Sequence, residues 1–506
     1  MKITQKDRRT TLFALLFCFI SSLLLLLICT KSSPLYPLND WEDANIFFTM
    51  GKGMMQGKVL YRDLYDQKGP LLYLLYGLSS LVSGTTFFGV FLLEVVSFTA
   101  FLFICYRLFG LYTEKNRLLA LPVLGALILS AMSVAHGGSV EQLCLPLFAY
   151  SLYRAVKYYQ FQESGSMSYG EVLLHGALAG CILWMKYTML GFYIAWMGVL
   201  AISLCCTKQW KKAILSCLVF LLGMGVATLP WLVYFAANGA LGDLFLYYFY
   251  YNIFQYSEFT DASVLARLLT IGRHTLATFF RNAQYSLLIV LGIAWLTFSK
   301  SAKAKPWLKI CLWSLAVVTT FFIYFGGIGY RYYGLILAVF SALGMIPLLL
   351  LLNRLTDGKA IAARLSRYLP AALLVPALGF SFLVSDNSYL LGVSRADTPQ
   401  YRFAETIAEN QKDETRTLLN YGFMDSGFYL AADVVPTSKY FTALNLRLPE
   451  LGQEQDRFVQ EQLVEFIVTE KAPLNDENYR LIDQAELYYE EEMRHYWLYQ
   501  RIDAAQ

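Results

Sequence analysis

The residues best suited to chemistry lie together in one polar segment, positions 31–69, which follows the first apolar run of the chain. The segment contains five acidic residues and a lysine next to the following apolar run: Asp40, Glu42, Asp43, Asp63, Asp66 and Lys68. A positioned carboxylate can accept a proton from a hydroxyl nucleophile, and a lysine can neutralise a developing anion. A loop that only joined two hydrophobic segments would need none of these charges. The segment is therefore the first candidate for an active site.

The composition indicates a membrane protein. The 506 residues are 57% hydrophobic and only 15% charged, which exceeds the apolar fraction of typical soluble chains. About eleven apolar runs are long enough to cross a bilayer, near residues 10–30, 86–109, 118–135, 140–158, 172–188, 190–206, 213–236, 284–299, 307–325, 332–352 and 368–385. The formal charge of +4 does not indicate a nucleic-acid partner, and the nine cysteines, all in or beside apolar runs, predict packing rather than disulfides.

The basic residues predict the orientation of these spans. If the Lys/Arg-rich start of the chain is cytoplasmic, alternation places the basic loops near residues 107–117, 154–157, 208–212, 300–309 and 354–367 inside. This agrees with the positive-inside rule. It requires the short apolar run at 70–83 to lie along the outer surface instead of spanning the membrane.

The same topology sends residues 31–69, the turn around Glu141, the loop 238–282 and everything after residue 385 to the outside. Residues 386–506 are charged throughout and contain strand-like runs at 417–422, 438–443, 465–470 and 495–502. We therefore expect an all-α polytopic membrane domain over 1–385, with 31–69 as its first outer loop. A small extracytoplasmic α/β domain is expected over 386–506.

One motif carries a resemblance to a known superfamily. Residues 51–76 read GKGMMQGKVLYRDLYDQKGPLLYLLY, shortly after Asp43. This pattern resembles the first outer loop of the polytopic GT-C glycosyltransferases, which include protein O-mannosyltransferases and the enzyme that adds aminoarabinose to lipid A. In those families an acidic residue precedes a Lys-Pro-Pro-Leu-Leu-Tyr-like segment, and here Gly69 replaces the first proline. Weaker similarities follow in the same order at 137–148, 184–190, 238–245, 326–340 and 418–441.

The resemblance implies a membrane enzyme that transfers a hexose or pentose from a polyprenyl-phosphate donor to an acceptor outside the cell. The acceptor would be a cell-wall or surface glycan, or a lipid. Asp43 aligns with the catalytic acid of the family and would act as the general base of an inverting displacement, with Asp40 as the second catalytic candidate. Without the motif, an acidic residue here would be a solvated surface charge.

Three cations are candidates for binding the donor phosphate. Lys68 adjoins the apolar run at 70–83, Arg331 follows the glycine-rich turn at 326–329, and Lys186 lies inside an apolar stretch, where a charge tends to mark a site. Each has a second interpretation, in which the side chain extends to the interface and anchors a helix end.

The remaining charged residues have supporting roles in this hypothesis. Glu42, like Asp40, would orient Asp43, bind the acceptor or cap a helix. Asp66 and Asp63 would hold Lys68 or Arg62 in place. Glu141 would contact the acceptor or provide a helix N-terminal charge. Arg273 belongs to a basic cluster, proposed as a second phosphate contact, with Arg267, His274 and Arg281.

Neither a metal nor another cofactor is indicated, because the four histidines are scattered and no DxD motif is present, although a divalent cation could still bridge carboxylate and phosphate.

Two other function classes stay open. A polysaccharide polymerase or ligase would use Arg and His in a large middle loop, and a lipid-linked oligosaccharide flippase or transporter would concentrate charges along a central passage. The expected location is the cell membrane of a bacterium, with the site on the outer side.

Overall fold

The fold, seen in a computed structural model, is described for residues 5–162, 167–255, 263–357, 368–446, 448–489 and 492–502. The chain divides into two compact units. The first unit comprises Met1–Thr30, Leu93–Pro230 and Glu258–Tyr389, and the second comprises Lys31–Leu92, Trp231–Ser257 and Leu390–Gln506. The predicted first outer loop and the predicted C-terminal domain therefore belong to the same unit.

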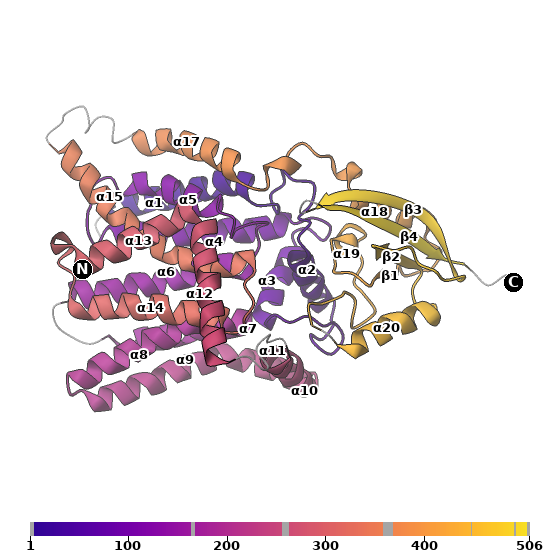
Figure 1. The fold of residues 1–506 in the computed structure, drawn as a ribbon, viewed down its shortest axis with the longest axis horizontal. Helices are drawn as coiled ribbons and strands as arrows, with labels where there is room; N and C mark the ends of the chain where they lie inside the picture. The colour runs from indigo at the N-terminus through magenta and orange to yellow at the C-terminus, as the bar shows by residue number, and fades with distance from the viewer. Residues whose placement is uncertain are drawn as a thin grey trace. The chain divides into compact units, whose positions relative to one another are not determined.

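The first unit is built of helices. Its elements are α1 (Gln5–Cys29), most of α4 (Phe88–Phe109), η1 (Arg117–Leu119), α5 (Ala120–Leu129), α6 (Val140–Val156), η2 (Lys157–Phe161), α7 (Tyr169–Lys186), η3 (Tyr187–Leu190), α8 (Gly191–Cys206), most of α9 (Trp210–Ala237), α12 (Val264–Arg281), α13 (Ala283–Phe298), η5 (Lys300–Ala302), α14 (Pro306–Tyr324), η6 (Arg331–Phe340), α15 (Ser341–Thr356), α17 (Leu369–Val384) and η7 (Ser388–Leu390). Within this unit α1 packs with α5 and α17, α13 with α15, and α14 with α8 (Figure 1).

Each predicted apolar run contains a helix in the structure, although the run at 118–135 leaves its helix after Leu129, and this confirms the helical, multi-pass character of the chain. Among the described residues, six helices are long and apolar enough to cross a membrane, or seven if the bent pair α12–α13 counts as one span. The expected number of about eleven spans stays a prediction, because α5, α6 and α17 are short. Residues 358–367 of one predicted inside loop lie outside the described residues.

The apolar run from Tyr169 to Cys206 is interrupted at its middle. It is 38 residues long, about twice what one crossing needs. The backbone at Lys186 is extended, with φ −159° and ψ 99°, and the 3₁₀ turn η3 follows. This break separates the two spans that the sequence predicts at 172–188 and 190–206.

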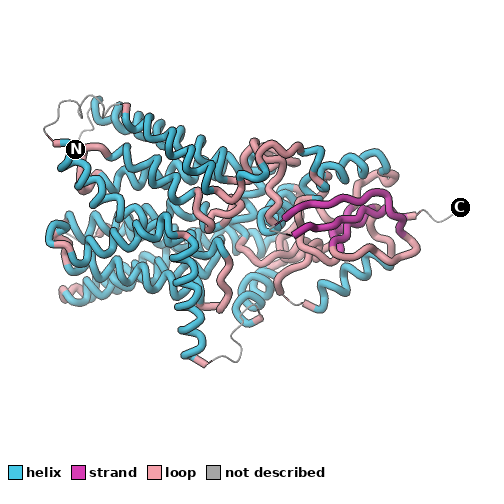
Figure 2. Tube along the Cα trace, turned by 45° about the horizontal axis from the view of Figure 1, so that its top comes forward, coloured by secondary structure: helices cyan, strands magenta, loops and turns pink. Residues whose placement is uncertain are grey.

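The second unit combines short helices with a small sheet (Figure 2). Its helices are α2 (Glu42–Met55), α3 (Pro70–Ser80), α10 (Leu241–Asp243), η4 (Leu244–Tyr250), α11 (Tyr251–Phe254), η8 (Arg395–Asp397), α18 (Pro399–Asn410), α19 (Phe428–Ala431) and α20 (Pro449–Gln460). Its strands are β1 (Leu418–Tyr421), β2 (Phe466–Glu470), β3 (Tyr479–Tyr489) and β4 (Glu492–Arg501).

The sheet has the order β1-β2-β4-β3. Strands β1 and β2 are parallel and joined through α20, whereas β2 pairs antiparallel with β4, and β3 with β4. Helix α20 buries Phe458 and Val459 against Leu419 and Ile467 of the sheet. The predicted α/β class of the C-terminal segment is thereby confirmed.

One predicted strand is wrong. Residues 438–443 form an irregular segment, because Thr442 uses its hydroxyl oxygen to accept a hydrogen bond from the backbone N–H of Asp425, at 2.7 Å. Such side-chain bonds to the backbone compete with strand pairing. Strand β3, in contrast, was not expected, because its side chains are mostly exposed and its sequence is rich in polar residues.

Helices α2 and α3 hold the first-loop residues. They approach so closely that a Cβ atom added at Gly51 would lie 2.4 Å from the backbone nitrogen of Gly77. Two glycines at this crossing therefore permit direct backbone contact. The run predicted to lie along the surface, residues 70–83, is α3 and the turn after it.

Candidate active site

Asp43 and Lys68 meet in the second unit. Asp43 lies in the first turn of α2, and Lys68 immediately precedes Gly69, the residue that caps α3. The Lys68 Nζ to Asp43 Oδ2 distance is 3.8 Å, which is an ion pair but too long for a direct hydrogen bond. Both side chains are partly exposed, at 14% for Lys68 and 16% for Asp43. The ring of Phe47, one helical turn after Asp43, lies 5.4 Å from the ammonium group.

Asp40 is placed differently from Asp43. Its Oδ1 accepts a hydrogen bond from Lys31 Nζ at 2.7 Å, and both side chains are buried. Asp40 Oδ2 is also buried and has no hydrogen-bond partner among the described residues. Lys31 was not singled out from the sequence. Its position directly after the first apolar helix is where a basic residue commonly anchors a membrane helix.

Glu42 is bound by two side chains of the C-terminal sheet. Arg494 Nη1 donates a hydrogen bond to Glu42 Oε1, and Tyr489 Oη donates to Glu42 Oε2, both at 2.9 Å. The Arg494 guanidinium also stacks on the Tyr489 ring, 4.0 Å from its centroid. No sequence signal points to this contact, since Arg494 and Glu42 are 452 residues apart in the chain.

Asp66 lies fully inside the second unit. Tyr73 Oη donates to Asp66 Oδ2 at 2.6 Å and accepts a hydrogen bond from the backbone N–H of Lys68 at 2.8 Å. Burial raises the pKa of Asp66, and the charge of Lys68 and the Tyr73 hydrogen bond oppose this shift. Tyr73 therefore fixes both the buried carboxyl group and the backbone of the lysine. Asp63, the other acid of this segment, pairs with Arg62 at 3.0 Å.

In the first unit, Lys186 and Glu141 form a buried ion pair at 2.5 Å. Lys186 ends α7, and its ammonium group lies 3.5 Å from the centroid of the Tyr333 ring. Glu141 lies in the first turn of α6, where an acidic side chain is favourable. A further acid of this region was missed from the sequence: Glu94 of α4 is buried and accepts a hydrogen bond from Gln142 at 3.3 Å.

Arg331 and Arg273 are exposed residues of the first unit. Arg331 begins η6, directly after the 326–329 turn. Arg273 lies on α12. The next residue on this helix, His274, contacts the 326–329 turn, with its Nε2 atom 2.9 Å from the Gly327 carbonyl oxygen. A Cβ at Gly329 would lie 2.1 Å from His274 Nδ1, so a glycine is required where the ring packs.

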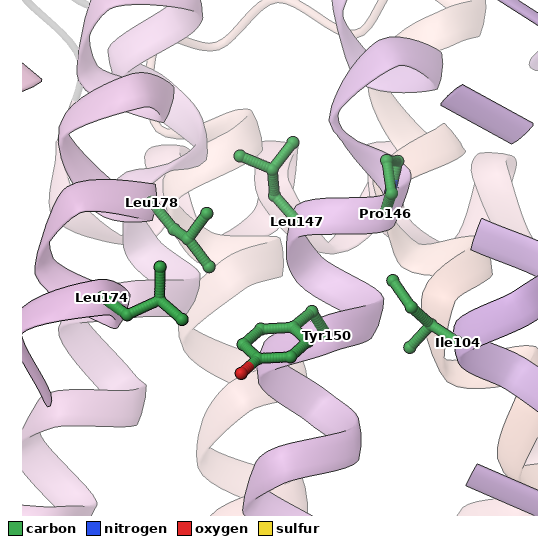
Figure 3. Close-up of a pocket in the computed structure, with 6 residues that line it drawn as sticks. All are labelled: Ile104, Pro146, Leu147, Tyr150, Leu174 and Leu178. Atoms are coloured by element: carbon green, nitrogen blue, oxygen red, sulfur yellow. The ribbon is translucent and has the colours of Figure 1, made fainter. Parts of the chain in front are cut away.

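A shallow, open apolar pocket lies on the surface of the first unit. It has a volume of about 310 Å³ and is lined by residues of α4, α6 and α7 (Figure 3). Its lining residues are Ile104, Pro146, Leu147, Tyr150, Leu174 and Leu178. This pocket offers no charged group to a phosphate, so its lining suits a hydrocarbon. Within the described residues, no cluster of three or more His, Cys, Asp and Glu side chains could hold a metal ion.

Comparison with solved structures identifies the fold. A structure of ArnT from Cupriavidus metallidurans bound to undecaprenyl phosphate superposes with a TM-score of 0.58, at 13% identity, over 96% of this chain and 98% of that one. The chain has the ArnT fold. The apo structure of the same ArnT gives a TM-score of 0.58 at 15% identity, over 97% of this chain and 98% of that one. No protein-family model and no curated protein sequence matches the chain.

The likeness to ArnT confirms the GT-C-like membrane fold that the first-loop motif predicted. It extends over nearly the whole length of both chains, so the small sheet domain is included. At this level of identity the fold is shared, whereas the chemistry must be argued from the residues of this chain.

Proposed function

We propose that this protein is a membrane glycosyltransferase that moves a sugar from a polyprenyl-phosphate donor to a hydroxyl of an extracytoplasmic glycan or lipid. The observation that carries the proposal is the meeting of Asp43 with Lys68 at the start of two helices, in a fold shared with a protein that binds undecaprenyl phosphate. A carboxylate and an ammonium group are what proton removal and phosphate departure require.

The proposed reaction is a single displacement. The acceptor oxygen attacks the anomeric carbon of the sugar while the bond from that carbon to the phosphate oxygen breaks, and the phosphate leaves with the bonding electrons. The acceptor hydroxyl proton passes to the Asp43 carboxylate, so that a glycoside, a polyprenyl phosphate and a protonated Asp43 result. Water then takes up the proton. The displacement inverts the anomeric centre.

Asp43 suits the role of base better than Asp40. A carboxylate is too weak a base to deprotonate an alcohol in advance, but it can accept the proton as the new bond forms, which typically contributes about a hundredfold or more to the rate. Such a group must reach the acceptor. Asp43 is partly exposed, whereas Asp40 is buried and held by Lys31. We assign to Asp40 the structural role of fixing the segment before α2.

Lys68 is the proposed phosphate ligand of the first-loop site, whereas Arg331, in the first unit, stays a separate prediction. Phosphate is a stable leaving group and needs fixed positive charge instead of a general acid. The Lys68 backbone is held by Tyr73 and its ammonium group is partly exposed. Arg331 is exposed and follows a glycine turn. Lys186 is buried against Glu141 and Tyr333. We therefore assign to it a structural role, in which it stabilises the first unit.

The test is a transfer assay on the purified full chain in lipid nanodiscs. Polyprenyl-phosphate-linked hexoses and pentoses are offered in turn with a glycan or lipid acceptor, and the product is detected by mass spectrometry. In parallel, surface glycans of cells with and without the gene are compared. We expect one donor to be consumed and one sugar to be missing from the glycans of the deletion strain. Unchanged glycans, together with no turnover of any donor, would refute the proposal.

A further inference from the structure

The helix that carries Asp43 has two faces with different partners. About 100° separate successive residues of an α-helix, so Glu42, Thr49 and Lys52 of α2 lie on one face. Asp43, Phe47 and Gly51 lie on the opposite face. Phe47 contacts Tyr73 and Tyr76 of α3, and Gly51 contacts α3 directly. The Asp43 face therefore belongs to the first-loop site.

The other face of α2 is bound along its length by the C-terminal segment. Glu42 is held by Arg494 and Tyr489. Thr49 Oγ1 donates to Asp425 Oδ2 at 2.9 Å, and Lys52 Nζ pairs with Asp433 Oδ1 at 2.5 Å. These polar contacts recur over three turns of the helix.

The hairpin that binds Glu42 extends beyond the sheet. Strand β2 pairs with β4 only from Phe466 to Glu470, opposite Gln500 to Tyr496. The β3–β4 pairing continues past this point to Tyr489 opposite Glu492. A two-stranded ribbon is marginally stable by itself, and a sheet of this size does not need the extra length. The extension brings the two side chains that hold Glu42 to the start of α2.

We infer that the β3–β4 hairpin sets the position of the catalytic helix, with Arg494 as the main positioning residue acting through Glu42. The inference rests on the proposed function, because it assigns a role to Arg494 in presenting Asp43. Glu42 immediately precedes Asp43, so fixing the Glu42 carboxylate fixes the first turn of α2 and the direction of the next side chain. Arg494 touches neither donor nor acceptor in this account. It acts on turnover and leaves donor affinity unchanged.

The position of Arg494 between two carboxylates explains why an arginine is needed. Arg494 Nη1 reaches Glu42, while Arg494 Nε lies 3.6 Å from Glu470 Oε1 on the neighbouring strand. A guanidinium group can bridge two carboxylates with a defined orientation, which a lysine does less well. Glu470 thus anchors the arginine in the sheet, and the arginine transmits that position to α2.

The experiment compares Arg494→Gln, Arg494→Lys and Glu42→Gln/Arg494→Gln with wild type in the full-length protein. The matched control is Arg457→Gln, which removes an exposed arginine of α20 that pairs with Glu454 and Glu461. Three quantities are measured: kcat, the Kd for undecaprenyl phosphate and the midpoint of thermal unfolding. A displacement of about 1 Å at the base can reduce turnover about a hundredfold.

We expect Arg494→Gln to lower kcat by about ten- to a hundredfold with the Kd unchanged, Arg494→Lys to recover part of the rate, and Arg457→Gln to resemble wild type. If Arg494→Gln unfolds, the double variant, which leaves no unpaired charge at position 42, must fold and still turn over slowly. Wild-type kcat in Arg494→Gln or in the double variant would overturn the inference. The proposed function fails separately, by undiminished turnover in Asp43→Asn.

Discussion

The carboxylate of Asp43 and the ammonium group of Lys68 lie 3.8 Å apart, although the two residues come from different helix starts. Asp43 lies in the first turn of α2 and Lys68 precedes α3, and the two helices cross in close contact at Gly51 and Gly77. A proton acceptor and an anion ligand are thus presented together. The expected outcomes below follow from this relationship and from the contacts around it.

Substitution of Lys68 should weaken donor binding. Lys68→Ala removes the positive charge beside Asp43, so we expect the Kd for undecaprenyl phosphate to rise about tenfold or more, given that a charge-assisted hydrogen bond contributes about 1.5–3 kcal/mol. Lys68→Arg should retain most of the affinity. Lys58→Ala, in the same segment, is the control. Binding is measured by intrinsic tryptophan fluorescence, and equal affinity for Lys68→Ala and wild type would remove Lys68 from the phosphate site.

The spacing of α2 and α3 can be tested without touching a charge. Gly51→Ala places a methyl group against the backbone of Gly77, and overpacking of this kind typically costs about 1–3 kcal/mol. The two helices must then move apart, and the Asp43 side chain moves with α2. Because a displacement of about 1 Å can lower a reaction rate strongly, we expect turnover to fall at least tenfold. Gly242→Ala is the control, because a Cβ there meets nothing within 4 Å. Wild-type turnover in Gly51→Ala would show that the close crossing is not needed.

The stability of the C-terminal fold should depend on pH through Asp425. Burial raises the pKa of Asp425 to about 6 from an ordinary value of 3.8, against the hydrogen bonds that the carboxylate accepts. The folded state then holds a proton that the unfolded state releases, so the stability that Asp425 contributes is fully present below pH 4 and is lost as pH rises to about 6. The loss amounts to about 3 kcal/mol, from 1.36 kcal/mol per pKa unit.

Asp425→Asn should remove this dependence. Asparagine keeps an oxygen acceptor but has no titrating group. The midpoint of thermal unfolding of the variant should therefore stay level between pH 4 and 6, while the midpoint of the wild-type protein falls. Both midpoints are measured by thermal unfolding in detergent, followed by tryptophan fluorescence at several pH values between 4 and 6. Parallel pH profiles for the two proteins would contradict the assignment.

The ion pair of Lys186 and Glu141 should matter for stability more than for donor binding. Removing one partner leaves a buried charge uncompensated, which costs about 3–5 kcal/mol, whereas removing both is close to neutral. We therefore expect Lys186→Met to unfold at lower temperature and Lys186→Met/Glu141→Leu to recover. The recovered double variant should bind undecaprenyl phosphate like wild type. Lost binding in a stable double variant would instead make Lys186 a donor ligand.

Much of the fold could be predicted from local sequence. The apolar runs gave helices because a bilayer requires each span to satisfy its own backbone hydrogen bonds. The motif at 51–76 identified the segment in which Asp43 and Lys68 meet, since the two residues lie only 25 positions apart. Periodicity and a local motif were sufficient for these features.

The partners of Glu42 could not be predicted in this way. Arg494 reaches Glu42 from the opposite end of the chain through a hairpin whose first strand, β3, shows a polar and mostly exposed pattern. Residues 438–443 have strand-like composition but bond through side chains to the backbone. Both cases depend on contacts between distant segments, for which one sequence carries no spacing signal.

The central claim is that Asp43 accepts the acceptor proton, and turnover by Asp43→Asn tests it most directly. Asparagine preserves the shape of the side chain and removes its basicity, so we expect kcat to fall about a hundredfold or more with the Kd for undecaprenyl phosphate nearly unchanged. Asp63→Asn, which neutralises an acid of the same segment that pairs with Arg62, should turn over like wild type. Undiminished kcat in a folded Asp43→Asn protein would contradict the account.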